Sequence, residues 1–306
     1  MAGPWHVGER RVQERVGEAH LADRLADGIR ADVPDVAIEF LAGLPQIVLA
    51  AAAADSDVDS HDQVWVTALN GPPGFLDVPR PDLLTIAARP QVDDPLAEVL
   101  AHPARVGLIA LEPGTRTRVR LNGRSRPVGG GLEVELDQVF ANCPKHIHPR
   151  EVVGTTTTDP SAHLTAGPAL TDDAIRRLTT ADTFFVGSTD DEGNADASHR
   201  GGPPGIIDVL DETHLRFPDF RGNSMYQTLG NLDLHPAVGL LVLDWTTGAA
   251  LHLTGRAQVD YDLTPELQAR FPRAQRLITV EIDGVVDRPA ASPLRWADSA
   301  QVPSHR

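Results

Sequence analysis

Short apolar runs bounded by Gly, Pro and Asp dominate the chain. Val, Ile, Leu, Phe and Thr are frequent in these runs, which is typical of β-strands. The clearest predicted strands are residues 46–52, 64–69, 105–111, 183–189, 238–244 and 249–259. The chain is therefore expected to be mainly β, with a smaller helical part.

Apolar residues recur at helical spacing in four segments. These predicted helices are residues 9–27, 93–101, 172–180 and 224–234. Thr171 directly precedes the third and is a candidate N-cap. The first is amphipathic and is expected to pack on the outside of the molecule.

The second half of the chain repeats motifs of the first half in the same order. Gly-Pro-Pro-Gly at 71–74 recurs at 202–205, and His-Pro followed by Val-Gly-Leu occurs at 102–108 and again at 235–240. Asn-Gly-Arg at 122–124 matches Thr-Gly-Arg at 254–256, and LEVELD at 132–137 matches ITVEID at 278–283. These matches predict a small antiparallel barrel made twice, with the copies packed as an internal pseudo-dimer.

The repeat also predicts how the chain is divided. An N-terminal helical segment covers residues 1–39, and the first copy covers 40–148. A Thr-, Gly- and Pro-containing linker, 149–175, leads to the second copy at 176–296 and a C-terminal tail at 297–306.

Composition excludes several classes of partner. The 306 residues carry 27 Lys+Arg and 43 Asp+Glu, a net charge of −16, which repels phosphate backbones and anionic lipid surfaces. Neither nucleic acid nor a membrane is expected as a partner. The N-terminus has charges where a signal peptide needs apolar residues, so the expected location is the cytoplasm.

A single cysteine, Cys143, excludes an internal disulfide. Its spacing to His146 and His148 is typical of zinc ligands, but there is no second ligand group in the sequence to complete a site. A structural role for these residues is favoured, and no metal is expected.

The copies differ at one position that is suited to bind an anion. Arg221-Gly222-Asn223-Ser224 precedes the predicted helix of the second copy, where the first copy has Arg89-Pro90-Gln91. Free N–H groups at a helix start, together with hydroxyl, amide and guanidinium donors, are suited to a phosphate. The alternative is a helix cap with no ligand.

Two further polar elements are each present in one copy. Ser198-His199-Arg200-Gly201 lies in the second copy, and neighbouring strand residues face opposite ways, which favours Ser198 and Arg200 over His199 as ligand contacts. Lys145, the only lysine, lies in a segment that only the first copy has. The halves are therefore expected to build one composite site between them.

Several of these motifs together resemble the flavin-binding split-barrel family related to pyridoxamine 5′-phosphate oxidase, in its tandem form. They are LNGPPGF at 69–75, RLNGR at 120–124, NCPK at 142–145, ADTFF at 181–185, SHRGG at 198–202, FPDFRGNS at 217–224, TLGNL at 228–232 and LTGR at 253–256. The resemblance implies six-stranded split barrels, dimeric assembly and an FMN phosphate near 221–224 and 198–200.

The resemblance also implies an FMN-dependent oxidoreductase acting on a small molecule, because a flavin performs the electron transfer and the protein holds and tunes it. The residues expected to bind the cofactor are Ser198, His199, Arg200, Gly201, Arg221, Gly222, Asn223, Ser224, Asn231, Lys145 and Trp296. Lys145 and His199 are the catalytic candidates. Arg120, Arg124 and Arg295 are candidates for the opposite wall.

Other readings stay open. FAD, a deazaflavin or haem could replace FMN, with His199 or His146 as an axial haem ligand. The chain could also be a non-catalytic flavin carrier, or the partner of a separate reductase that supplies electrons. It could be a homodimer or a pseudo-dimeric monomer. Oxidation of pyridoxamine phosphate itself is not expected, since the residues for that substrate's phosphate have no confident match.

Overall fold

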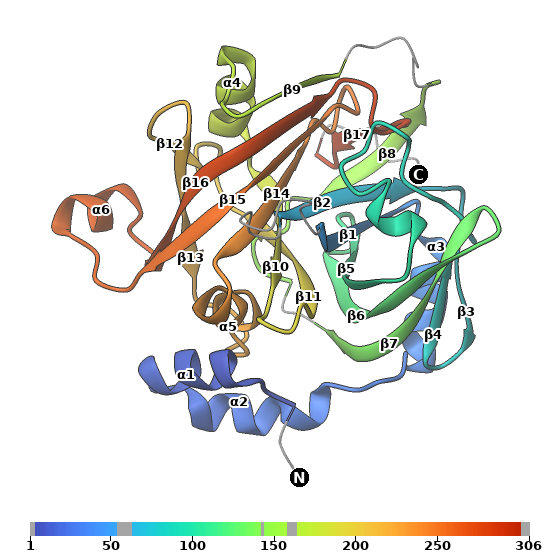
Figure 1. Ribbon diagram of the computed structural model, residues 1–306, viewed down its shortest axis with the longest axis horizontal. Coiled ribbons are helices and arrows are strands. Elements are labelled where there is room, and N and C mark those ends of the chain that lie inside the picture. Colours follow the sequence, from blue (N-terminus) through green and yellow to red (C-terminus); the bar gives the residue numbers. More distant parts are fainter. Residues whose placement is uncertain (1–3, 54–62, 142–143, 158–163, 301–306) are drawn as a thin grey trace.

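The computed structural model describes residues 4–53, 63–141, 144–157 and 164–300 (Figure 1). The first half forms a seven-stranded antiparallel sheet with the order β2-β1-β5-β6-β7-β4-β3. Its strands are β1 (Gln46–Ala53), β2 (Gln63–Asn70), β3 (Leu76–Arg80), β4 (Leu83–Ile86), β5 (Ala104–Glu112), β6 (Thr117–Val128) and β7 (Gly131–Ala141).

The second half forms a sheet with the corresponding order, β11-β10-β14-β15-β16-β13-β12, and β9 (Thr165–Gly167) is added on β16. Its other strands are β10 (Thr183–Thr189), β11 (Ala195–Gly201), β12 (Asp208–Val209), β13 (His214–Phe220), β14 (Ala237–Leu243), β15 (Ala250–Asp260) and β16 (Ala274–Arg288). The fold is mainly β, as predicted. The resemblance implies six strands per barrel, whereas each of the two strand orders contains seven strands.

Both sheets carry a bulge at the same place in this order. The register shifts between Asn122 and Gly123 on β6, and between Thr254 and Gly255 on β15. Glycine is required at both bulges, because a Cβ would collide with the carbonyl oxygen of Glu135 or Glu281 on the neighbouring strand.

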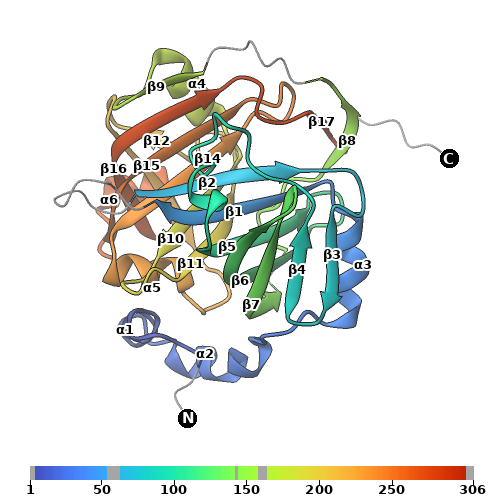
Figure 2. The same ribbon diagram turned by 45° about the vertical axis from the view of Figure 1, so that its right-hand side comes forward.

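The alternation of side chains along the strands builds three apolar layers. On β1, Ile47 and Leu49 face the core of the first half, whereas Val48 faces a separate cluster shared by the two halves. On β10, Phe184 faces the second core and Phe185 the shared cluster. β1 and β10 therefore each face their own core on one side and the partner sheet on the other. Figure 2 shows the two sheets lying against each other.

Two glycines permit this close packing of the halves. A Cβ on Gly107 of β5 would collide with the backbone of Asp196 on β11. A Cβ on Gly239 of β14 would lie 2.6 Å from the carbonyl oxygen of Val64 on β2. Both belong to the repeated Val-Gly-Leu motif, so the motif marks the points where the sheets meet.

Helices and one small sheet flank these layers (Figure 1). The helices are α1 (Val7–Arg15), α2 (Ala19–Leu25), α3 (Asp35–Gly43), α4 (Asp172–Thr180), α5 (Gln227–Leu234) and α6 (Pro265–Arg270), with 3₁₀ turns at Ala26–Gly28 and Val99–Ala101. β8 (Arg150–Thr155), within the expected linker, pairs with β17 (Leu294–Asp298). None of the described helices has the length and apolar character to cross a membrane.

The predicted strands are confirmed, and so is the helix at 172–180, where Thr171 accepts a hydrogen bond from the Ala174 N–H. The single helix predicted at 9–27 is wrong. Gly17, at φ +73°, interrupts it and separates α1 from α2. The prediction that this segment packs on the outside of the molecule is only partly correct, because α1 packs against α5 with Gly8 facing Gly230.

Two other helix predictions are too long. Of residues 93–101 only a 3₁₀ turn at the end is helical, because the Asp94 carboxylate accepts the Leu96 N–H and binds the buried Arg288 instead. The helix predicted from Ser224 begins at Gln227, since Ser224 and Tyr226 have positive φ angles of 61° and 64°.

The carboxyl of Glu9 on α1 is buried and caps its own helix. The Glu9 residue is 1% exposed, and its carboxyl accepts a 2.8 Å hydrogen bond from the backbone N–H of His6. Burial raises the pKa of Glu9 from 4.5 to about 8. Between these values the folded protein retains a proton that the unfolded chain has released, so stability falls as the pH rises through this window.

We predict that Glu9→Gln removes this pH dependence. Between pH 5 and 8 the unfolding free energy of the natural protein should fall relative to Glu9→Gln by up to about 1.4 kcal/mol per pH unit, measured by urea unfolding. Glu14→Gln, an exposed change on the same helix, is the control and should follow the natural protein. Parallel curves for the natural protein and Glu9→Gln would contradict the assignment.

Candidate functional site

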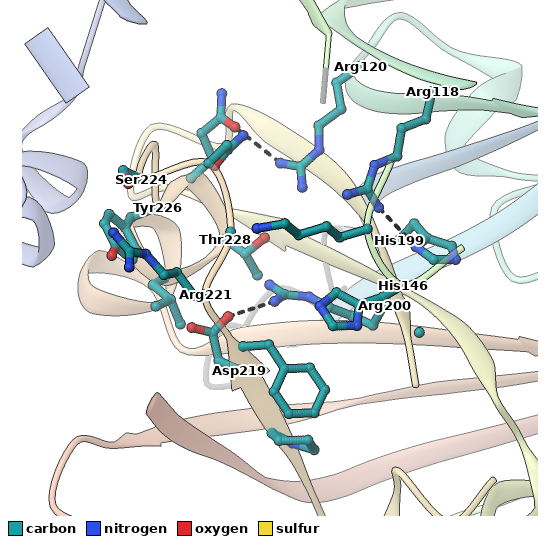
Figure 3. Close-up of a pocket in the computed structure, with 18 of the residues that line it drawn as sticks. Arg118, Arg120, His146, His199, Arg200, Asp219, Arg221, Ser224, Tyr226 and Thr228 are labelled. Carbon is teal, nitrogen blue, oxygen red and sulfur yellow. Dashed lines mark hydrogen bonds and ion pairs between the residues drawn. The ribbon is translucent and has the colours of Figure 1, made fainter. Parts of the chain in front are cut away.

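A cavity of about 110 Å³ lies where the two halves meet (Figure 3). The first half contributes Arg118 and Arg120 from β6, and Lys145 and His146 from the segment after β7. The second half contributes the end of β11, the segment 218–226 and the first turn of α5. Neither half could form this cavity alone.

Positive charge dominates the lining. Arg118, Arg120, Lys145, Arg200 and Arg221 face a single carboxylate, Asp219, among the described lining residues. That carboxylate is already bound, because Arg200 donates to its Oδ1 at 2.7 Å and Arg276, outside the cavity, donates to its Oδ2 at 3.0 Å. The remaining positive charge makes the cavity suited to an anion.

Arg120 is held by an ion pair that crosses between the halves. Its Nη1 donates to both carboxylate oxygens of Asp196, at 3.1 and 3.0 Å, and to Gln227 Oε1 at 3.1 Å. Burial lowers the pKa of Arg120, although the Asp196 charge opposes this effect. The pair fixes β6 of one half against β11 and α5 of the other.

His199 is neutral and presents a donor. Arg118 donates to its Nδ1 at 3.0 Å, and a guanidinium can only donate, so the ring proton lies on Nε2. Burial, and then the charges of Arg118 and Arg200, hold the pKa of His199 well below its usual value. Nε2 is buried and has no hydrogen-bond partner among the described residues.

His146 and Phe220 bring an aromatic surface to the cavity. Their rings are stacked with centroids 5.1 Å apart, and His146 has a positive φ of 65°. Burial and the neighbouring cations Arg273, Arg118 and Lys145 lower the pKa of His146. The surface is therefore uncharged at neutral pH and can support a planar group.

The segment before α5 supplies donors. α5 has no side-chain cap, and the N–H groups of its first turn have no partner within the helix. Asn223 Oδ1 accepts the Met225 N–H at 3.1 Å, which shapes the turn. The Glu18 carboxylate binds the Ser224 hydroxyl and, at 2.7 Å, the Tyr226 hydroxyl. Arg221 is exposed, as is Lys145.

The structure brings together eight of the eleven residues predicted to bind the cofactor. They are Lys145, His199, Arg200, Gly201, Arg221, Gly222, Asn223 and Ser224. His199 and Arg200 both border the cavity, against the expectation that His199 would face away. β11 is the edge strand of its sheet, so side chains from both of its faces reach a cavity at that edge.

Three predicted residues lie elsewhere. Ser198 is fully buried beside the cavity, where its hydroxyl accepts a 3.2 Å bond from Thr228. Asn231 donates to Ser188 at 3.0 Å and borders a different cavity. Trp296 packs edge-to-face on Trp245, with ring centroids 5.5 Å apart, and lines a third cavity.

The expected opposite wall is partly different. Arg120 lines the cavity, whereas Arg124 lines the same cavity as Asn231, and Arg295 binds the backbone carbonyl of Ser292. Arg118 was missed, although it lies two residues before Arg120 and therefore on the same face of β6. Phe220, Tyr226, Gln227 and Thr228 were also missed, although Phe220 and Thr228 belong to the FPDFRGNS and TLGNL motifs.

The two histidines that follow the cysteine make separate contacts in the structure. Cys143 lies outside the described residues. His148 contacts the Gly202 carbonyl oxygen at 2.8 Å, and His146 stacks on Phe220. Within residues 4–53, 63–141, 144–157 and 164–300, no three His, Cys, Asp or Glu side chains are placed to hold a metal ion.

The corresponding place at the other junction of the halves is a cavity of about 180 Å³, lined in part by Asp94 and Arg288. Strand register makes Thr67 the counterpart of Ser198, since each lies three residues before the end of the paired strand. The Thr67 hydroxyl donates to the buried Asp94 carboxylate, to which Arg288 donates at 2.8 Å. Arg288 also binds Asp93 at 2.7 Å. At this junction the protein therefore supplies its own anion.

Solved structures match parts of the chain, whereas no family model and no curated protein matches it. A provisionally assigned pyridoxamine 5′-phosphate oxidase from Lactobacillus delbrueckii is 21% identical, with a TM-score of 0.33 over 38% of this chain and 93% of that chain. An FMN-binding protein from Syntrophomonas wolfei is 9% identical, with a TM-score of 0.30 over 37% and 82%. HupZ from Group A Streptococcus is 10% identical, with a TM-score of 0.33 over 40% and 98%.

The structural neighbours thus include FMN-binding and pyridoxamine 5′-phosphate oxidase-like proteins, the group that the motifs resemble. Each of the three spans about two fifths of this chain and most of its own length.

Removing the Asp196 carboxylate should destabilise the whole fold. Asp196→Ala leaves Arg120 buried without its charge partner, which typically costs about 3–5 kcal/mol of unfolding free energy. Asp137→Ala breaks the exposed pair with Arg124 and should cost about 0–1 kcal/mol. Urea unfolding measures both changes. Equal, small losses would show that the inter-half pair does not hold the halves together.

Proposed function

We propose that the chain is an FMN-dependent oxidoreductase and that the basic cavity holds the FMN phosphate. The observation that carries the proposal is the convergence of five cationic side chains from both halves on a cavity whose described lining has one carboxylate. Two of the five are already in ion pairs, Arg200 with Asp219 and Arg120 with Asp196. The uncapped first turn of α5 adds N–H donors, which favour an anion.

The size of the cavity supports a phosphate rather than a whole nucleotide. Its volume of about 110 Å³ is well below the ~300–1,000 Å³ of sites that enclose a drug-sized ligand. The enclosed part therefore accommodates an anionic group, and the rest of the cofactor would extend beyond it.

The residues present fit this cofactor. Arg221, Arg200 and Lys145 would bind the phosphate, together with the first turn of α5. The orphaned Nε2–H of His199 offers a further hydrogen bond. The paired rings of His146 and Phe220 offer an apolar surface to a planar ring system. When bound, the flavin would supply electron or hydride transfer to a small-molecule substrate.

The other junction of the halves lends further support. There the counterpart of the cavity holds the Asp94 carboxylate bound by Arg288, so an anion already occupies the equivalent position. The two junctions have the same strand order but differ in the source of the anion. At one junction the anion is the protein's own Asp94, and at the other, in this proposal, it is the cofactor phosphate.

Arg221→Ala should weaken FMN binding by about 10- to 100-fold, because a charge-assisted hydrogen bond contributes about 1.5–3 kcal/mol. Quenching of flavin fluorescence on titration measures the affinity. Arg80→Ala, an exposed arginine on β3, makes the same charge change away from the cavity and should bind as the natural protein does. Unchanged binding by Arg221→Ala would place the phosphate elsewhere. A Soret band in place of flavin absorbance would favour haem.

The number of cofactors bound is a separate prediction. Because the Asp94 carboxylate, bound by Arg288, already provides an anion in the cavity at the second junction, FMN titration should saturate at about one FMN per chain, the count implied by one anion site. Saturation at two per chain, measured by absorbance after removal of free flavin, would show that the second junction also binds cofactor.

A further inference from the structure

A second cavity of about 370 Å³ lies on the far side of the Arg120–Asp196 pair from the basic cavity. Its lining comes from three parts of the chain: β6 and β7 of the first half, the β10–β11 turn and α5 of the second half, and the N-terminal residues Pro4, His6 and Glu9. This volume is within the ~300–1,000 Å³ range of small-molecule sites.

The charge of this cavity is opposite to that of the basic cavity. Asp137, Asp190, Glu192 and Asp196 line it, against Arg105 and Arg124. Asp137 is paired with Arg124 and Asp196 with Arg120, whereas Arg105 contacts the amide of Asn194. Asp190 and Glu192 of the β10–β11 turn have no ion-pair partner among the described residues, and Arg105, which contacts the same turn, offsets one of these two charges.

Asp190 is the central group of this turn. It is 5% exposed, and its carboxylate accepts from the N–H groups of Glu192 and Asn194 and from the Asn194 side chain at 2.7 Å. All these donors are neutral, and Asp190 has no ion-pair partner among the described residues. A buried carboxylate without a counter-charge is costly, so a cation is the partner that this position lacks.

An unpartnered acceptor indicates that the cation carries N–H groups. Asn122 on β6 lines the cavity and is 8% exposed, and its Oδ1 is buried with no hydrogen-bond partner in the described chain. Its Nδ2 faces Gln138 and Asp196. The Asn122 amide therefore uses its donor on other residues of the lining, whereas its oxygen has no donor among the described residues.

We propose that this cavity binds a small organic ammonium ion, whose N–H groups donate to Asn122 Oδ1 and whose charge is balanced by Asp190 and Glu192. The site is separate from the proposed phosphate site and does not depend on it. The two cavities share Gln227, and the Arg120–Asp196 pair separates the cation from the anion.

The test is calorimetric titration of the full chain with 1,4-diaminobutane, with uncharged 1,4-butanediol of the same length as the matched ligand control. Diaminobutane should bind and butanediol should not. Asp190→Asn keeps the oxygen that caps the turn but removes the charge, and should weaken binding at least about 10-fold, equivalent to about 1.4 kcal/mol. Asn122→Leu, which removes the acceptor, should also weaken it.

Asp82→Asn, an exposed change on the turn between β3 and β4, is the control variant and should bind diaminobutane as the natural protein does. Glu192→Gln, also exposed, tests the same charge if Asp190→Asn does not fold. Absence of binding at millimolar diaminobutane, or equal binding by the natural protein and the charge-removing variant, would overturn the proposal. FMN titration of the same variants should be unchanged, which separates this result from the fate of the flavin proposal.

Discussion

The packing of two sheets through their outer faces is the constraint on which the rest of the structure depends. Strands β1 and β10 place one set of side chains in their own core and the alternate set in the shared cluster. Among the described strands, neither β1 nor β10 has a face left for solvent. The two halves must therefore meet in one register of β1 against β10. Gly107 and Gly239 set how closely they approach, and the Arg120–Asp196 pair fixes the register with a charge.

This packing creates two similar junctions with different chemistry. At one of them, cations from β6 of the first half meet β11 and α5 of the second half. At the other, the corresponding strand β15 carries His252, which lies three residues before its bulge as Arg120 does. His252 Nδ1 donates to the backbone oxygen of Val66 at 2.8 Å instead of presenting a charge. Sequence differences between the copies predicted a single composite site, and the difference in lining between the two junctions corresponds to it. The assignment of this site to a flavin belongs to the proposed function.

Much of the fold could be predicted from the sequence, because alternation of apolar residues and repeated turns are local patterns. The limits of the helix expected from Ser224 could not, since Ser224 and Tyr226 adopt positive φ angles and both side chains bind Glu18, which is distant in the sequence. The site was predicted where motifs differ between the copies, as at 221–224. Asn231 was chosen from the TLGNL motif and Trp296 from a C-terminal segment expected to form the opposite wall, and neither lines the basic cavity. Arg118 and the acidic cavity require the three-dimensional meeting of segments that no motif joins.

The carboxylate that the protein supplies at its second junction has an evolutionary consequence. In a symmetric pair of identical subunits, one substitution alters both sites at once, and a change that improves one cannot be confined to it. Here Asp94 and Arg288 satisfy one junction permanently. Selection for ligand preference can therefore act on one side of the molecule, while selection for a firmly closed interior acts on the other, within a single gene.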